Sequence, residues 1–134
     1  EIGTGSGYFA ACLARMGRQV RTLEIFADLA QAADRSLKAH AVTNITVESA
    51  DASRLPAEPH YDVIALTASL PVYDARFERA LKPGGRLFVV VGPGPVMEAR
   101  LVTRVAEQQW ARESLFETAI PPMINAVRPD AFSF

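Results

Sequence analysis

The sequence predicts an α/β fold, a doubly wound and mostly parallel sheet that ends in an antiparallel hairpin. A glycine-rich turn opens the chain, with Gly3, Gly5 and Gly7 at every second position after Glu1. Apolar strand patterns and amphipathic helix patterns then alternate as far as residue 91. After that point two strand patterns with interleaved polar residues follow each other directly. Alternation is typical of parallel sheets, and adjacent strands with a short connection are typical of a hairpin.

The period of the apolar residues places the elements along the chain. Helices are expected over residues 8–16, 27–41 and 71–81. Strands are expected over residues 20–25, 44–48, 61–67, 86–91, 98–105 and 112–120. The sequence Lys82-Pro83-Gly84-Gly85 indicates a turn before the strand at 86–91, because Pro and Gly both favour turn conformations.

Helical spacing also predicts which side chains face the core. The inward residues of the first helix are expected to be Phe9, Cys12, Leu13 and Met16. Those of the second are Leu29, Ala33 and Leu37, and those of the third are Tyr73, Phe77 and Leu81. Four aromatic residues are interpreted as packing for the hairpin and the tail: Trp110, Phe116, Phe132 and Phe134.

Composition limits the class of protein. With 134 residues, 49% of them hydrophobic, the chain can form one domain over residues 1–134 with its own core. We expect this domain to lack its N-terminal portion, because such a turn should follow a strand and no strand fits before Glu1. The sequence does not indicate an oligomeric state.

Charge and cysteine content limit the partners and the compartment. A formal net charge of −1 gives no reason to expect binding to nucleic acid or to an anionic membrane. One cysteine excludes an internal disulfide and favours a reducing, cytoplasmic location. No apolar run approaches the length of a membrane span. His40 and His60 have no partner at metal-ligand spacing, so no metal site is expected.

Three loops at the carboxyl ends of the strands carry the candidate binding residues, where ligands of doubly wound sheets bind. The first is the glycine turn, in which glycine lets the backbone approach a ligand closely. The second ends at Glu24, 21 residues after Gly3, where a carboxylate can accept hydrogen bonds from ribose hydroxyls. The third is Asp51-Ala52, where a carboxylate and a backbone N–H can bind an adenine. Tyr8 does not fit the G-x-G-x-x-G pattern, which argues against a nicotinamide cofactor.

With these residues the sequence resembles the class I S-adenosylmethionine-dependent methyltransferases, which have a Rossmann-like fold. More narrowly, it resembles a divergent bacterial branch of the protein-L-isoaspartate O-methyltransferase family. Three stretches carry this resemblance: Glu1-Ile2-Gly3-Thr4-Gly5-Ser6-Gly7-Tyr8, Tyr61-Asp62-Val63-Ile64 with Thr67-Ala68-Ser69-Leu70-Pro71, and Leu81-Lys82-Pro83-Gly84-Gly85-Arg86-Leu87. Two features depart from the family pattern: Ala50-Asp51-Ala52 in place of a G-D-G-like stretch, and Ser69-Leu70 in place of small residues.

The resemblance implies an enzyme that transfers a methyl group from S-adenosyl-L-methionine to the carboxylate of L-isoaspartyl residues in damaged proteins. The methyl ester then collapses to a succinimide, which allows repair to aspartate. The cofactor-binding residues would be Glu1, Gly3, Thr4, Gly5, Ser6, Gly7, Glu24, Asp51 and Ala52. Thr67 and Ala68 would lie near the methyl-transfer face. The catalytic residues are unknown, and the resemblance places the acceptor-binding segment before Glu1.

Two other functions remain open on the sequence. A methyltransferase of the same fold could act on a small molecule or on tRNA. A non-catalytic or nicotinamide-binding module of the same fold belongs to a different class, and Tyr8 and Asp51 argue against it.

Overall fold

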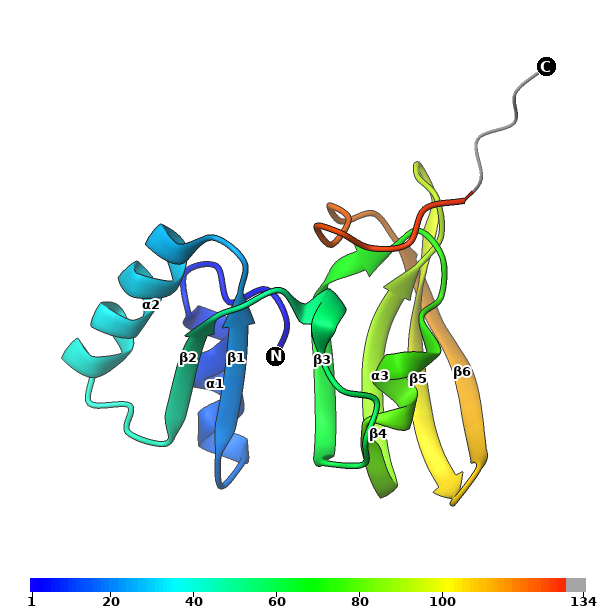
Figure 1. The fold of residues 1–134 in the computed structure, drawn as a ribbon, viewed down its shortest axis with the longest axis horizontal. Coiled ribbons are helices and arrows are strands. Elements are labelled where there is room, and N and C mark those ends of the chain that lie inside the picture. Colours follow the sequence, from blue (N-terminus) through cyan, green and yellow to red (C-terminus); the bar gives the residue numbers. More distant parts are fainter. Residues whose placement is uncertain (130–134) are drawn as a thin grey trace. The chain divides into compact units, whose positions relative to one another are not determined.

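The computed structural model describes residues 1–129, which form two compact units (Figure 1). The first unit is Glu1–Arg54, and the second begins at Leu55. Each unit has its own sheet. The expectation of one domain over residues 1–134 stays a prediction, and Phe132 and Phe134 lie outside the described residues.

The first unit alternates helices and strands as expected. In chain order it contains α1 (Tyr8–Met16), β1 (Val20–Glu24), α2 (Ala27–Ala39), β2 (Ile45–Ser49) and the short 3-10 helix η1 (Ala52–Arg54). β1 and β2 are parallel, with Val20 opposite Ile45 and Glu24 opposite Ser49. On the other edge of β1, Leu23 forms a parallel bridge with Ile2. The segment that leads into the glycine turn therefore extends this small sheet.

The buried face of α1 differs from the predicted one, whereas in α2 Ala33 and Leu37 are buried as predicted and only Leu29 departs. Phe9 of α1 is 41% exposed and Met16 is 78% exposed, whereas Ala10 and Ala14 are buried. In α2, Leu29 is 43% exposed, and the buried residues are Ala30, Ala33 and Leu37. The prediction gave most weight to the larger side chains, but the faces that pack inward are largely alanine. Small residues let helix and strand backbones approach closely, so these positions can carry the packing.

The second unit is one four-stranded sheet in the order β3-β4-β5-β6. Its elements are β3 (Tyr61–Leu70), α3 (Ala75–Arg79), β4 (Leu81–Val91), β5 (Met97–Ala106) and β6 (Gln109–Thr118). β3 and β4 are parallel, whereas β5 and β6 are antiparallel to their neighbours. The predicted hairpin is therefore confirmed. Its core includes Leu66, Leu70, Phe77, Leu87, Val89 and Val102.

The third helix and the turn after it differ in their bounds from the prediction. α3 has 5 residues, because it begins only after Asp74, whose side chain accepts a hydrogen bond from the backbone N–H of Arg76 at 3.0 Å. The Lys82–Gly85 stretch is a bulge within β4, since the register of β3 against β4 shifts between Tyr61 and Val63. A Cβ at Gly85 would lie 2.8 Å from the carbonyl oxygen of Lys82, so only glycine fits there.

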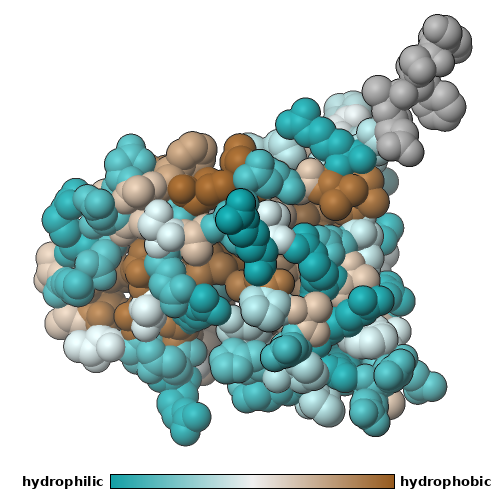
Figure 2. Space-filling model, viewed as in Figure 1, coloured by the Kyte–Doolittle hydropathy of each residue, from teal (hydrophilic) through white to brown (hydrophobic). Residues whose placement is uncertain are grey.

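Apolar side chains also reach the surface of both units. They include Tyr8, Phe26 and Val63, which are 75%, 52% and 53% exposed. On the face drawn in Figure 2, hydrophobic patches lie within a mainly hydrophilic surface. Within residues 1–129 no helix is long and apolar enough to cross a membrane.

A buried carboxylate fastens the hairpin to α3. Glu78 is only 4% exposed, and its side chain accepts hydrogen bonds from the hydroxyl of Tyr73 and from Nη2 of Arg112 at 2.6 Å. Burial and the hydrogen bond to Glu78 raise the pKa of Tyr73, so the phenol stays protonated and donates a hydrogen bond to the Glu78 carboxylate. Nε1 of Trp110 donates to the backbone carbonyl of Glu78 at 2.9 Å. The packing role predicted for Trp110 is confirmed, whereas Phe116 is 55% exposed.

We predict that Arg112→Ala lowers the free energy of unfolding of the second unit by about 2 kcal/mol. Removing the guanidinium leaves the buried Glu78 carboxylate without its cation, which is costly; the half-exposed position of Arg112 reduces the effect. Urea unfolding, monitored by the fluorescence of Trp110, measures this change in free energy. Trp110 is the one tryptophan of the sequence and lies on the same strand as Arg112.

Arg100→Ala is the matched control, because Arg100 pairs with Glu98 on the same hairpin but both side chains are about one third exposed. This variant should unfold at the same urea concentration as the wild type. Equal midpoints for both variants would contradict the anchoring role of Glu78.

Candidate functional site

The glycine turn adopts a backbone that other residues rarely take. The φ angles of Gly3, Gly5 and Gly7 are 98°, 52° and 83°. A Cβ on Gly7 would lie 3.3 Å from side-chain atoms of Ala33 and Leu37, so Gly7 allows the turn to pack on α2. A Cβ on Gly5 would have no atom within 4 Å. Gly7 therefore serves packing, and Gly5 borders open space.

Glu24 joins the end of β1 to this turn. The side chain is 6% exposed, and its Oε2 accepts a hydrogen bond from the backbone N–H of Gly5 at 2.9 Å. Its Oε1 accepts from the backbone N–H of Phe26 at 3.2 Å. Two of the three predicted loops are thus brought together by one carboxylate.

A chain of side-chain hydrogen bonds lies under the turn. Thr22 Oγ1 donates to Glu1 Oε2 at 2.6 Å, and the hydroxyls of Thr4 and Thr22 are 2.7 Å apart. Thr22 is fully buried and Thr4 is 4% exposed. Thr22 is not among the residues predicted from the sequence, although it stands two residues before Glu24 and the period of a strand places both on one face.

One carboxylate oxygen of Glu1, Oε1, is buried. Among the described residues nothing hydrogen-bonds to this oxygen. Burial raises the pKa of the Glu1 carboxyl; the hydrogen bond from Thr22 opposes this rise, and the negative charge of Glu24 adds to it. A buried acceptor without a donor is rare in folded proteins and suits a ligand that supplies one.

The end of β2 lies beside Glu24. The backbone N–H of Ala50 donates to the backbone carbonyl of Glu24 at 2.9 Å, so the loop that follows β2 begins next to the end of β1. Asp51 Oδ1 accepts from the backbone N–H of Ser53 at 2.8 Å, which fixes the start of η1. Ala52 is buried within η1. All three predicted binding loops therefore belong to the first unit, at the carboxyl ends of its strands.

Ser6 is the exposed member of the turn, and its Oγ accepts from the backbone N–H of Tyr8 at 3.4 Å. The first turn of α1 has no other side-chain cap, since Gly7 occupies the N-cap position. The free N–H groups of the first turn of α1, and the partial positive charge there, lie next to the glycine turn.

Thr67 and Ala68 belong to the second unit. The register of β3 against β4 runs from Ala65 opposite Phe88 to Ser69 opposite Val90, so β3 carries two extra residues between these pairs. Thr67 is exposed in this bulge, whereas Ser69 is buried and donates through Oγ to the carbonyl of Ile120 at 3.0 Å. Bulges often redirect side chains at functional sites. The approach of Thr67 and Ala68 to the cofactor stays a prediction.

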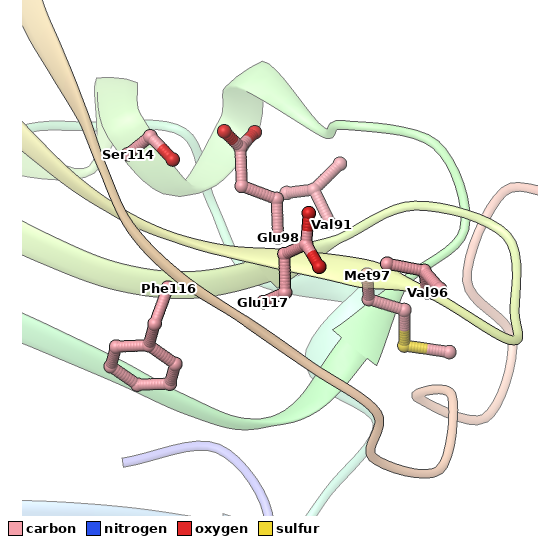
Figure 3. A pocket seen from close by; sticks show the side chains of 7 residues that line it. All are labelled: Val91, Val96, Met97, Glu98, Ser114, Phe116 and Glu117. Carbon is pink, nitrogen blue, oxygen red and sulfur yellow. The ribbon is translucent and has the colours of Figure 1, made fainter.

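The second unit also has a shallow pocket of about 260 Å³ (Figure 3). It lies where β4 ends and β5 begins, and Glu98 of β5 stands directly opposite Glu117 of β6. Its lining is Val91, Val96, Met97, Glu98, Ser114, Phe116 and Glu117, which includes none of the predicted site residues. In residues 1–129 no cluster of three or more His, Cys, Asp and Glu side chains could hold a metal ion.

Solved structures with the same fold include two methyltransferases. One is a Plasmodium falciparum structure described as a protein-L-isoaspartate O-methyltransferase in complex with S-adenosyl-L-homocysteine; it has a TM-score of 0.80 and 18% identity over 91% of this chain and 63% of that one. Another, named protein-L-isoaspartate O-methyltransferase, has a TM-score of 0.78 and 24% identity over 90% of this chain and 40% of that one. At these identities the likeness establishes the α/β methyltransferase fold, as the sequence predicted.

Curated relatives are closer in sequence. A protein-L-isoaspartate O-methyltransferase of Brucella anthropi is 35% identical over 97% of this chain and 61% of its own length. Protein-L-isoaspartate O-methyltransferase 1 of Geotalea uraniireducens is 38% identical over 94% of this chain and 58% of its own length. The chain thus spans about three fifths of the length of these relatives.

A family model gives the same result over nearly the whole chain. The model for protein-L-isoaspartate(D-aspartate) O-methyltransferase matches residues 1–126, which include the glycine turn, Glu24, Asp51 and the hairpin. The chain therefore belongs to the protein-L-isoaspartate(D-aspartate) O-methyltransferase family.

Proposed function

We propose that the full-length protein transfers a methyl group from S-adenosyl-L-methionine to the side-chain carboxylate of L-isoaspartyl residues in damaged proteins. Membership of the family and the names of the relatives support this activity. The observation in the structure that carries the proposal is the junction of the glycine turn with Glu24, beside the buried Oε1 of Glu1, which has no hydrogen-bond partner among residues 1–129.

The first unit fits the amino-acid end of the cofactor. Oε1 of Glu1 is a buried acceptor that finds no donor in the described part of the chain, and the methionine moiety carries an ammonium group that can donate. Open space beside Gly5 leaves room for a ligand to approach the backbone. Glu1, Gly3, Thr4, Gly5, Ser6 and Gly7 would form this part of the site.

Glu24, Asp51 and Ala52 would bind the nucleoside. An ionised carboxylate has about four lone-pair positions, and the two backbone N–H groups on Glu24 use only part of that capacity. Its remaining positions could accept the ribose hydroxyls. Asp51, fixed by the backbone N–H of Ser53, and the backbone of Ala52 would face the adenine.

The reaction requires little acid–base chemistry from the chain. When bound, S-adenosyl-L-methionine supplies a sulfonium methyl group that is open to in-line attack. The acceptor carboxylate is already ionised at neutral pH, so the protein does not need a general base. The contribution of its residues would be alignment and exclusion of water, which can give large rate enhancements. Thr67 and Ala68 are our candidates for residues beside the acceptor.

The identity of the acceptor is part of the same proposal. A protein or peptide with isoaspartyl residues is favoured by the family, and a single cysteine fits a reducing compartment such as the cytoplasm. A methyltransferase with a small-molecule or tRNA acceptor would share the cofactor site, and a non-catalytic nucleotide-binding module would share only the fold.

We predict that the full-length protein methylates an isoaspartyl peptide at least about 100-fold faster than the peptide with aspartate at the same position. A site that fits one backbone geometry can discriminate against the other to this extent. Transfer of labelled methyl from S-adenosyl-L-methionine measures this. If the protein binds S-adenosyl-L-homocysteine but methylates neither peptide, the proposed cofactor stands and the proposed acceptor is wrong. Failure to bind S-adenosyl-L-homocysteine would overturn the whole proposal.

We predict that Asp51→Ala weakens binding of S-adenosyl-L-homocysteine by about tenfold, or about 1.4 kcal/mol, because the adenine loses one charged acceptor. Titration calorimetry measures the affinity. Asp34→Ala is the matched control, since Asp34 is a more exposed carboxylate of the same unit that pairs with Lys38. If Asp51→Ala binds the ligand with wild-type affinity, Asp51 is not part of the site.

We predict that the affinity for S-adenosyl-L-homocysteine falls as the pH decreases, and that the fall begins above the pH range in which an ordinary carboxyl titrates. Burial raises the pKa of the Glu1 carboxyl, so Glu1 takes up its proton at a higher pH than an ordinary carboxyl and then no longer attracts the ligand's ammonium group. Glu1→Gln has no such titration and should bind weakly with little pH dependence. The same pH dependence in both proteins would contradict the role of Glu1.

A further inference from the structure

We propose that Thr22 is a positioning residue that presents the Oε1 of Glu1 to the ammonium group of the bound cofactor. The inference rests on the proposed function, because it assigns a role within the proposed cofactor site. Thr22 is not one of the residues expected from the sequence. It lies in β1, beneath the glycine turn, and is fully buried.

The direction of each hydrogen bond follows from the chemistry of the groups. An ionised carboxylate only accepts, so the short bond of 2.6 Å between Thr22 Oγ1 and Glu1 Oε2 uses the single hydroxyl proton of Thr22. The hydrogen bond of 2.7 Å between the two threonine hydroxyls must then be donated by Thr4. Thr4 donates to Thr22, and Thr22 donates to Glu1. Such a chain polarises each donor toward the carboxylate.

This arrangement holds one carboxylate oxygen and leaves the other, which is buried, without a hydrogen-bond partner among residues 1–129. Oε2 of Glu1 is occupied by Thr22, whereas Oε1 has no partner among the described residues. Without the hydroxyl of Thr22, the carboxylate would lose the donor that fixes its rotation. Its burial would then favour the protonated form more strongly, since the hydrogen bond from Thr22 favours the charged form.

A fully buried strand position ordinarily favours valine, which has the same shape as threonine. A buried hydroxyl is unfavourable unless it is hydrogen-bonded, and here both of its bonds lead to residues of the glycine-turn segment. The hydroxyl therefore serves the turn and Glu1 rather than the packing of β1 on its neighbours.

The test compares Thr22→Val with Thr22→Ser in the full-length protein, using two ligands. S-adenosyl-L-homocysteine carries the ammonium group, whereas 5′-methylthioadenosine has the same nucleoside and thioether without the amino-acid end. We expect Thr22→Val to bind S-adenosyl-L-homocysteine about tenfold more weakly and 5′-methylthioadenosine as well as the wild type does. Thr22→Ser keeps a hydroxyl and should restore most of the lost affinity.

The outcomes separate positioning from a general effect on the fold. An equal loss for both ligands in Thr22→Val would overturn the inference, because it would mean that Thr22 only maintains the turn. Equal losses in the Val and Ser variants would also overturn it. If the wild-type protein bound neither ligand, the proposed function itself would fail. If the wild type bound both ligands and Thr22→Val bound them equally well, only the role of Thr22 would be overturned.

Discussion

The hydrogen bonds of the Glu24 carboxylate to the backbone N–H groups of Gly5 and Phe26 determine the geometry of the proposed site. One buried side chain fixes the glycine turn on one side and the start of α2 on the other. The backbone carbonyl of the same residue accepts from Ala50, which brings in the end of β2. The carboxyl ends of neighbouring parallel strands are the places where such folds bind ligands. A single residue thus sets the relative positions of all three loops of the proposed site.

Gly5 and Gly7 differ in their surroundings within this arrangement. Gly7 is required because a side chain there would press against Ala33 and Leu37 of α2. Gly5 borders open space among the described residues, and its φ of 52° is one that other residues rarely adopt. Beneath them, the hydroxyls of Thr4 and Thr22 lead to the carboxylate of Glu1. The turn is therefore held by packing on one side and by buried hydrogen bonds on the other.

Element order and the loops of the site could be predicted from the sequence, because alternating periods, glycines and acidic residues at strand ends are local signals. The buried face of α1 could not, since Ala10 and Ala14 pack inward and the larger Phe9 and Met16 do not. The role of Thr22 was also not predicted. Its significance depends on partners 18 and 21 residues away in the sequence. Such contacts follow only from the pairing of the turn segment with β1.

A crystal structure of the full-length protein with S-adenosyl-L-homocysteine would show where the cofactor binds. We expect the ligand's ammonium group within about 3 Å of Glu1 Oε1, and its ribose hydroxyls at a similar distance from the Glu24 carboxylate. The hydrogen bond from Gly5 to Glu24 should persist. A ligand that leaves Glu1 Oε1 without a donor, or that binds away from the three loops of the first unit, would show that the proposed site is wrong.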